Sequence, residues 1–182
     1  MVLDANVLVP ARLRDVLLTL AEAGLFVPLW SPEILDEMHR HLPDRVSGAA
    51  RAHLVEQMRL AFPAALVVAP QRVTIEVAAR VNAKDRHLMA TVVHGHADTL
   101  LTEDRALRVQ SAGVCDVMSA AEFLAYTVDV SPAVARARLQ VMLRGWPEAA
   151  QLDADQAWAR LVSWMRRQGW TAAADILDEQ DT

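Results

Sequence analysis

Apolar and polar residues follow two different periods along the first two thirds of the chain. Short apolar runs, of a length suited to buried strands, lie at residues 1–3, 25–30, 65–69, 99–102 and 114–118. Between them apolar residues recur at helical spacing, which predicts helices at residues 10–23, 31–42, 49–62 and 85–94. Strands that alternate with helices form a parallel sheet covered on both faces. We therefore expect an α/β fold, a three-layer α/β/α sandwich with a parallel sheet.

Local end signals support several of these helices. Ser31 is a suitable N-cap, and Pro32 then occupies the first helical position. Ser119 and Glu122 form a capping box for a helix that follows the last strand. Residues 70–83 stay open, because their apolar positions suit a strand in one part and a helix in another.

The strand signals stop after Ser131. Pro132 opens one further helix, Asp153 with Gln156 caps a second, and Thr171 begins a third. We therefore expect a first domain at residues 1–126 and a C-terminal helical extension at residues 127–182. The extension carries four tryptophans, which either complete its own core or contact a partner protein. They are Trp146, Trp158, Trp164 and Trp170.

Composition narrows the class of protein. The chain has 182 residues, of which 53% are hydrophobic and 23% charged, and such a chain is globular and not disordered. Its single cysteine, Cys115, allows no intrachain disulfide, as is typical of a reducing cytoplasm. No apolar run approaches the roughly 20 residues of a membrane span, and no signal peptide is evident. We expect a cytoplasmic protein that makes no membrane contact.

The formal net charge of −5 argues against binding of nucleic acid through the whole surface. It leaves room for a nuclease, because clustered acids that hold metal ions contribute negative charge and the bound ions reverse the local field.

Four acidic residues occupy positions that a parallel sheet would bring together. Asp4 follows the first strand, Asp104 follows the strand at residues 99–102, Asp85 starts a helix, and Glu37 lies one turn inside another. Loops at the carboxyl ends of parallel strands build binding sites. Carboxylates that meet there tolerate one another when a divalent cation such as Mg²⁺ is bound.

Each acid also has a simpler explanation when it is taken alone. Asp4 could end its strand in a turn, Asp85 and Asp104 could cap helices, and Glu37 could be solvated. Glu33 and Asp36 are assigned to the favourable first turn of their helix. Histidine pairs at i,i+2 spacing point to different helix faces, so they do not predict a zinc site.

Four motifs, in order, resemble the PIN-domain family and especially its VapC-like bacterial toxins. They are Leu3-Asp4-Ala5-Asn6, Ser31-Pro32-Glu33-Ile34-Leu35-Asp36-Glu37, Lys84-Asp85-Arg86-His87 with Ala90, and Leu101-Thr102-Glu103-Asp104-Arg105-Ala106-Leu107. The resemblance covers roughly residues 1–126. It implies a ribonuclease that hydrolyses RNA phosphodiester bonds with Mg²⁺ or Mn²⁺.

The resemblance also assigns roles to residues. Asp4, Glu37, Asp85 and Asp104 would be the catalytic, metal-binding acids. Asn6, Thr102 and Glu103 would be supporting residues, the first two by orienting the acids through hydrogen bonds. Arg86 and His87, which flank Asp85, are candidates for contact with the substrate phosphate.

Two positions depart from the family pattern. Asn82 stands where many relatives carry a further acid, and Glu103 replaces a residue that is usually small. Family resemblance further implies a homodimer and a cognate antitoxin as partner. The alternatives are a PIN nuclease that processes RNA or cuts DNA without an antitoxin, and a catalytically silent PIN-like binding module.

Overall fold

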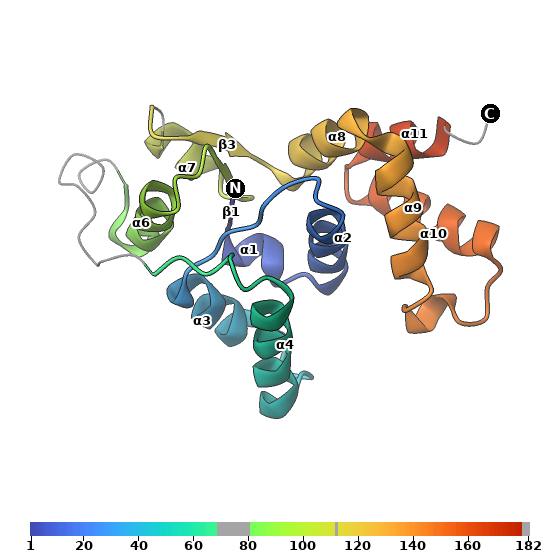
Figure 1. The fold of residues 1–182 in the computed structure, drawn as a ribbon, viewed down its shortest axis with the longest axis horizontal. Helices are drawn as coiled ribbons and strands as arrows, with labels where there is room; N and C mark the ends of the chain where they lie inside the picture. Colours follow the sequence, from blue (N-terminus) through green and yellow to red (C-terminus); the bar gives the residue numbers. More distant parts are fainter. Residues whose placement is uncertain (69–80, 112, 180–182) are drawn as a thin grey trace. The chain divides into compact units, whose positions relative to one another are not determined.

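The computed structural model describes residues 1–68, 81–111 and 113–179 (Figure 1). The chain divides into two compact units, which are described separately. One consists of Met1–Arg14 and Val27–Met118, and the other of Asp15–Phe26 and Ser119–Thr182. Most of the ambiguous segment at residues 70–83 lies outside the described residues.

A parallel sheet organises the first unit. Strands β1 (Val2–Leu3), β2 (Thr99–Leu101) and β3 (Asp116–Met118) pair in the order β1-β2-β3, with Leu3 opposite Leu101 and Leu101 opposite Met118. The apolar residues of β1 and the Leu100–Leu101 pair are fully buried, as expected for a sheet covered on both faces. The predicted α/β fold with a parallel sheet is confirmed.

Two of the predicted strands are shorter than expected. In the described parts of these two segments, residues 25–30 and 65–68, the pairing consists of single parallel bridges, Val2 to Leu29 and Trp30 to Leu66. Pro28 has no amide proton to donate to a neighbouring strand, and Ser31 already caps the next helix. The pairing on this side of β1 is therefore restricted to the residues next to Trp30.

β1 has a neighbour on each side. The segment at Leu29 pairs with it on one side, and β2 pairs with it on the other. From β1 the chain first crosses to the side of Trp30 and Leu66, and later returns on the opposite side as β2 and β3. Such a reversal of strand order is a topological switch point, where ligands bind beyond the carboxyl ends of the strands. Asp4 and Thr102 are the residues that follow β1 and β2 at this point.

Helices of the first unit follow the predicted apolar periodicity. Ser31 caps α3 by accepting a 3.4 Å hydrogen bond from the Ile34 amide, and Ile34, Leu35 and Met38 are buried. The described helices of the unit are α1 (Ala5–Leu8), α3 (Pro32–His41), α4 (Gly48–Ala61), η1 (Ala83–Asp85), α6 (Arg86–His94) and α7 (Arg105–Gln110). Helix α2 (Ala11–Glu22) begins in this unit and continues in the second.

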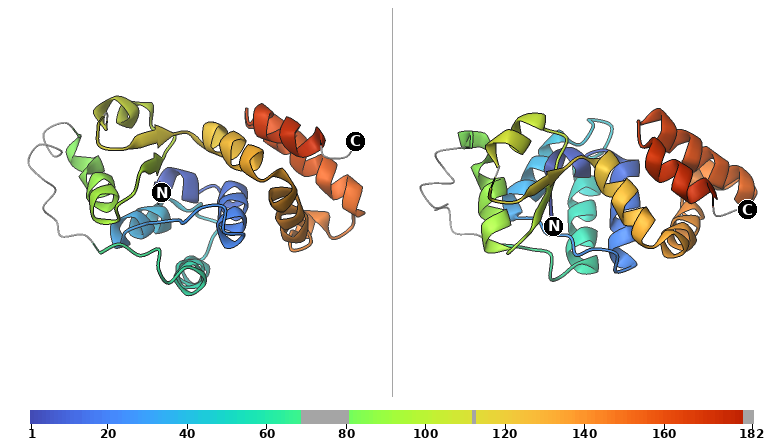
Figure 2. Two further views of the ribbon diagram at one scale, coloured as in Figure 1. Left: turned by 45° about the horizontal axis from the view of Figure 1, so that its top comes forward. Right: turned by 90° about the horizontal axis from the view of Figure 1, so that it is seen from above.

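The second unit is helical in its described residues (Figure 2). It contains α8 (Ala120–Val130), α9 (Pro132–Leu143), η2 (Pro147–Ala149), α10 (Ala154–Arg167) and α11 (Thr171–Asp178). The predicted capping boxes at Ser119 and Asp153 are both present. The C-terminal helices are thus confirmed. A domain boundary after residue 126 stays a prediction, and that position lies inside α8.

The tryptophans of the second unit pack mainly on one another and on its helices. Trp164 makes edge-to-face contacts with Trp146 and Trp170, at ring-centre distances of 6.3 and 4.9 Å. Trp158 and Trp170 are buried, and the Arg136 guanidinium lies 4.7 Å from the Trp158 ring. These contacts favour a role in the unit's own core over a role in binding a partner.

Candidate functional site

Three side chains meet where β1 and β2 end. Oδ2 of Asp4 accepts hydrogen bonds from the Thr102 hydroxyl at 2.6 Å and from the Asn6 amide group at 2.7 Å. The Asn6 amide also donates to the Thr102 hydroxyl oxygen at 2.9 Å. Asn6 Oδ1 in turn accepts from the Glu103 backbone amide at 3.2 Å, which establishes the orientation of the Asn6 side chain. The result is a closed triangle of polar groups around one carboxylate.

The main chain explains why Asp4 and Thr102 are adjacent. The Asp4 amide donates to the carbonyl of Leu101, and the Thr102 amide donates to the carbonyl of Met118, each at 3.0 Å. Parallel pairing therefore continues one residue past each strand. Asp4 is 6% exposed and Thr102 3% exposed, so the carboxylate is almost removed from water.

Burial governs the protonation of Asp4. It raises the pKa of this carboxyl, and the negative charge of Glu37 raises it further, whereas the hydrogen bond from Thr102 lowers it. Burial thus disfavours the ionised form of Asp4, and a divalent cation bound beside the carboxylate would favour that form.

Asp85 and Asp104 approach a shared lysine. Lys84 Nζ lies 3.9 Å from Asp85 Oδ1 and 3.7 Å from Asp104 Oδ2. Burial raises the pKa of Asp85; Lys84 and His87 lower it, and the charges of Asp104 and Glu37 raise it. The carboxylate of Asp85 therefore lies within the electrostatic reach of two other acids.

The capping explanation fits these two acids differently. The Asp85 side chain makes no cap hydrogen bond to α6, although the residue is almost buried. Asp104 does cap α7, because its Oδ1 accepts a 2.8 Å hydrogen bond from the Ala106 amide. Its other oxygen, Oδ2, faces Lys84. Capping alone accounts for one of the two oxygens of Asp104 and for neither oxygen of Asp85.

Glu37, on α3, is the fourth acid of this region. Its Oε2 lies 3.3 Å from His87 Nε2, and its charge acts on both Asp4 and Asp85. The histidine is thus next to an acid; its predicted contact with substrate phosphate stays a prediction. Arg86 is exposed at the start of α6.

The four acids share one region, but they do not form a tight cage. Among the described residues, no three histidine, cysteine, aspartate or glutamate side chains are arranged to hold one ion. The donor set still fits a hard cation. Mg²⁺ keeps several waters and is commonly bound through one or two carboxylates plus substrate phosphate, so a complete protein cage is not required.

An open hollow lies beside this region. It measures about 390 Å³ and is lined by Ala5, Asn6, Val9, Pro10, Glu37 and His41. His41 Nδ1 lies 2.8 Å from the Glu37 carbonyl oxygen. The volume is within the range of small-molecule sites, and two of the predicted site residues, Asn6 and Glu37, line the hollow.

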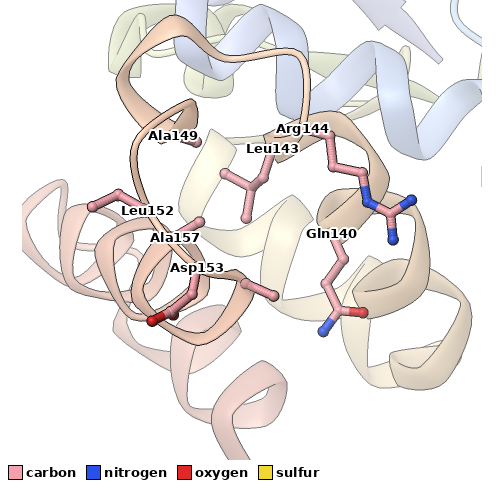
Figure 3. A pocket seen from close by; sticks show the side chains of 8 residues that line it. Gln140, Leu143, Arg144, Ala149, Leu152, Asp153 and Ala157 are labelled. Carbon is pink, nitrogen blue, oxygen red and sulfur yellow. The ribbon is translucent and has the colours of Figure 1, made fainter.

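The second unit has a pocket of its own, of about 240 Å³ (Figure 3). Its polar lining consists of Gln140, Arg144 and Asp153, and Leu143 and Leu152 supply much of the apolar part. Asp153 is already engaged as the N-cap of α10. This pocket brings no group of carboxylates together and does not resemble the first site chemically.

Sequence reasoning missed one neighbour of the acids, Lys84. Lys84 was only a flanking residue of a motif, and the sequence does not indicate that its ammonium reaches both Asp85 and Asp104. Asn82, which stands where many relatives carry a further acid, supplies no carboxylate. Its backbone amide donates to Gln110 Oε1 at 3.3 Å. The backbone amide of Glu103 donates to Asn6 Oδ1, and the supporting role of the Glu103 side chain stays a prediction.

Comparison with known proteins identifies the family. A family model described as PIN domain matches residues 1–106, which is more than half of the chain and includes every acid of the site. No curated protein and no solved structure matches the chain. Among the described residues, none of the helices is both long and apolar enough to cross a membrane.

Proposed function

The chain belongs to the PIN-domain family, and from that premise we propose that it is a metal-dependent endoribonuclease that acts as the toxin of a toxin–antitoxin pair. PIN domains are generally nucleases that use divalent metal ions. The observation that carries the proposal is the buried Asp4 carboxylate, which Asn6 and Thr102 orient beside Glu37. This arrangement speaks against a catalytically silent binding module, which would have no need to bury a charged group at the end of the sheet.

Asp4, Glu37, Asp85 and Asp104 would hold Mg²⁺ or Mn²⁺. The ion, when bound, supplies an activated water and neutralises charge on the phosphate. Asn6 and Thr102 restrict the Asp4 side chain to one orientation, as partners of metal-binding carboxylates commonly do. Since Asn6 is itself held by the Glu103 amide, the orientation of Asp4 depends on both strand ends.

The substrate would approach along the hollow lined by Asn6, Glu37 and His41. Arg86 and His87 lie on the first turn of α6, directly after Asp85, where they would contact a phosphate next to the acids. The overall charge of −5 is compatible with binding of RNA, because the metal supplies positive charge where the scissile phosphate lies.

A nuclease assay tests the proposal. Purified protein should cut a labelled single-stranded RNA in the presence of MgCl₂ or MnCl₂ and lose this activity in EDTA. Glu37→Gln should greatly reduce cleavage, whereas Glu33→Gln, on the exposed side of the same helix, should not. Absence of cleavage by the wild type with either metal would overturn the assignment as a nuclease.

The same assay separates the two nuclease alternatives. A DNA strand of identical sequence should remain intact if RNA is the substrate. Preferential cleavage of DNA would favour the alternative of a PIN nuclease that acts on DNA.

The toxin role needs a cellular test. Induced expression should arrest growth, the Asp4→Asn variant should not, and co-expression of a small protein encoded next to this chain should restore growth. Arrest that no neighbouring gene relieves would favour a nuclease of RNA processing.

We further propose that the protein is a cytoplasmic homodimer. Sedimentation of the purified protein would measure its oligomeric state.

A further inference from the structure

A lysine side chain lies between two of the candidate metal-binding acids. The Nζ atom of Lys84 is 3.9 Å from Asp85 Oδ1 and 3.7 Å from Asp104 Oδ2. Asp85 belongs to η1 and Asp104 follows β2, so the ammonium connects two separate elements of the first unit. Both distances exceed that of a normal hydrogen bond, and the contact is therefore ionic.

Electrostatics explains why a cation is needed at this position. Asp85 is almost buried, and burial raises its pKa, as does the charge of Asp104. The charge of Lys84 acts in the opposite direction. Without a positive charge between them, the two carboxylates would repel each other across a poorly solvated space.

We propose that Lys84 is an exchangeable counter-ion, which occupies the cation position between Asp85 and Asp104 and is displaced when a divalent metal ion binds. This inference rests on the proposed function, because it takes the two acids as metal ligands. Lys84 then competes with the metal and sets the metal concentration at which the site fills.

The surroundings of Lys84 suit such an exchange. The lysine side chain is 70% exposed, whereas that of Asp85 is 11% exposed and that of Asp104 is 31% exposed. A long, flexible ammonium side chain leaves at little cost, and an exposed ion pair is weak. The carboxylates are held in place: Asp85 is almost buried, and Asp104 is engaged by the Ala106 amide.

Direct titration of the metal tests the proposal without RNA. Metal-free wild type, Lys84→Gln and Lys84→Arg are titrated with MnCl₂ in a calorimeter. Lys84→Gln removes the competitor, so we expect roughly two- to fivefold tighter binding of Mn²⁺. Lys84→Arg keeps the charge and should bind Mn²⁺ much as the wild type does.

A matched control separates exchange from a general effect of charge. Arg105→Gln removes the same charge from an exposed residue directly after Asp104. It should leave the affinity for Mn²⁺ close to that of the wild type. In EDTA, Lys84→Gln should also unfold at a lower temperature than Arg105→Gln, because only the former leaves Asp85 and Asp104 without their cation.

The outcomes distinguish this inference from the proposed function. Equal affinity of Lys84→Gln and wild type, or an equal gain in Arg105→Gln, would overturn the exchange and leave the nuclease assignment intact. Weaker binding by Lys84→Gln would overturn it as well, since a competitor cannot strengthen metal binding. If no variant and not even the wild type bound Mn²⁺, the metal site of the proposed function would fail, and the exchange with it.

Discussion

The hydroxyl of Thr102 donates a 2.6 Å hydrogen bond to Oδ2 of Asp4, across 98 positions of the chain. Both residues are buried, so the bond is made in a region of low dielectric, where its loss leaves a carboxylate short of a donor. The bond exists because β1 and β2 are adjacent and parallel, with Leu3 opposite Leu101. Thr102 thereby connects the strand pairing to the orientation of the candidate metal ligand.

Replacing Thr102 by valine should weaken binding of Mn²⁺ by roughly 10- to 100-fold, the range typical of lost partners of metal ligands. Valine keeps the shape of threonine but cannot donate to Asp4. Thr99→Val, on the same strand, is the matched control and should bind Mn²⁺ normally. Calorimetric titration measures both. Unchanged affinity in Thr102→Val would show that the orientation of Asp4 does not depend on this bond.

Asp4→Asn should reduce RNA cleavage by roughly 100-fold or more, because the ligand itself contributes at least as much as its partners do. The asparagine oxygen can still accept from Asn6 and Thr102, so the fold should persist and the effect should be chemical. Cleavage rates together with circular dichroism spectra measure this. A folded variant as fast as the wild type would remove Asp4 from the catalytic set.

Asp85→Asn should leave the stability of the metal-free protein unchanged or raise it at pH 7. Burial raises the pKa of Asp85, so the folded protein binds a proton more tightly than the unfolded chain does. The contribution of Asp85 to the free energy of unfolding therefore falls as the pH rises from 3.8, the ordinary pKa of an aspartate, through the pKa of the folded protein. The advantage of the variant should shrink as the pH is lowered toward that value.

Urea unfolding in EDTA between pH 4 and pH 7.5 measures this effect. A loss of about 1 kcal/mol or more in Asp85→Asn at pH 7 would instead indicate a structural role of the kind that helix caps have.

Two substitutions of Asp104 should distinguish its role as a helix cap from its role in activity. Asp104→Ala loses the hydrogen bond from the Ala106 amide and should cost about 1 kcal/mol of stability along with activity. Asp104→Asn should keep the cap and the stability but still lose activity, since asparagine is an equally good N-cap without the charge. Thermal melts and cleavage assays measure the two roles independently. If Asp104→Asn were fully active, Asp104 would be a cap alone.

Asp153→Ala should destabilise the second unit by about 1 kcal/mol, because Asp153 and Gln156 form the capping box of α10. Asp155→Ala, in the first turn of the same helix, removes the same charge without the cap and should cost much less. Chemical unfolding compares the two. Equal costs would mean that the charge near the helix start, and not the capping box, matters.

Local signals in the sequence were sufficient for most of the helices. Ser31 with Pro32, Ser119 with Glu122, and Asp153 with Gln156 each act within three positions along the chain, and each begins a helix as predicted. The alternation of strands and helices likewise predicted a parallel sheet. These features depend on short-range contacts and on periodicity, both of which one sequence contains.

Tertiary structure decided the features that involve distant parts of the chain. The strand expected at residues 25–30 consists of bridges at Leu29 and Trp30 alone, because the extent of a strand depends on which residues of its neighbours can pair with it. The contacts of Lys84 with Asp104 and of His87 with Glu37 join separate elements, and no pattern in the sequence specified them. The sequence by itself determined which acids follow which strands and helices. Only packing brought those elements together and placed the Lys84 ammonium within 4 Å of both Asp85 and Asp104. Contacts between elements arise from how whole faces bury their apolar area and not from local preference.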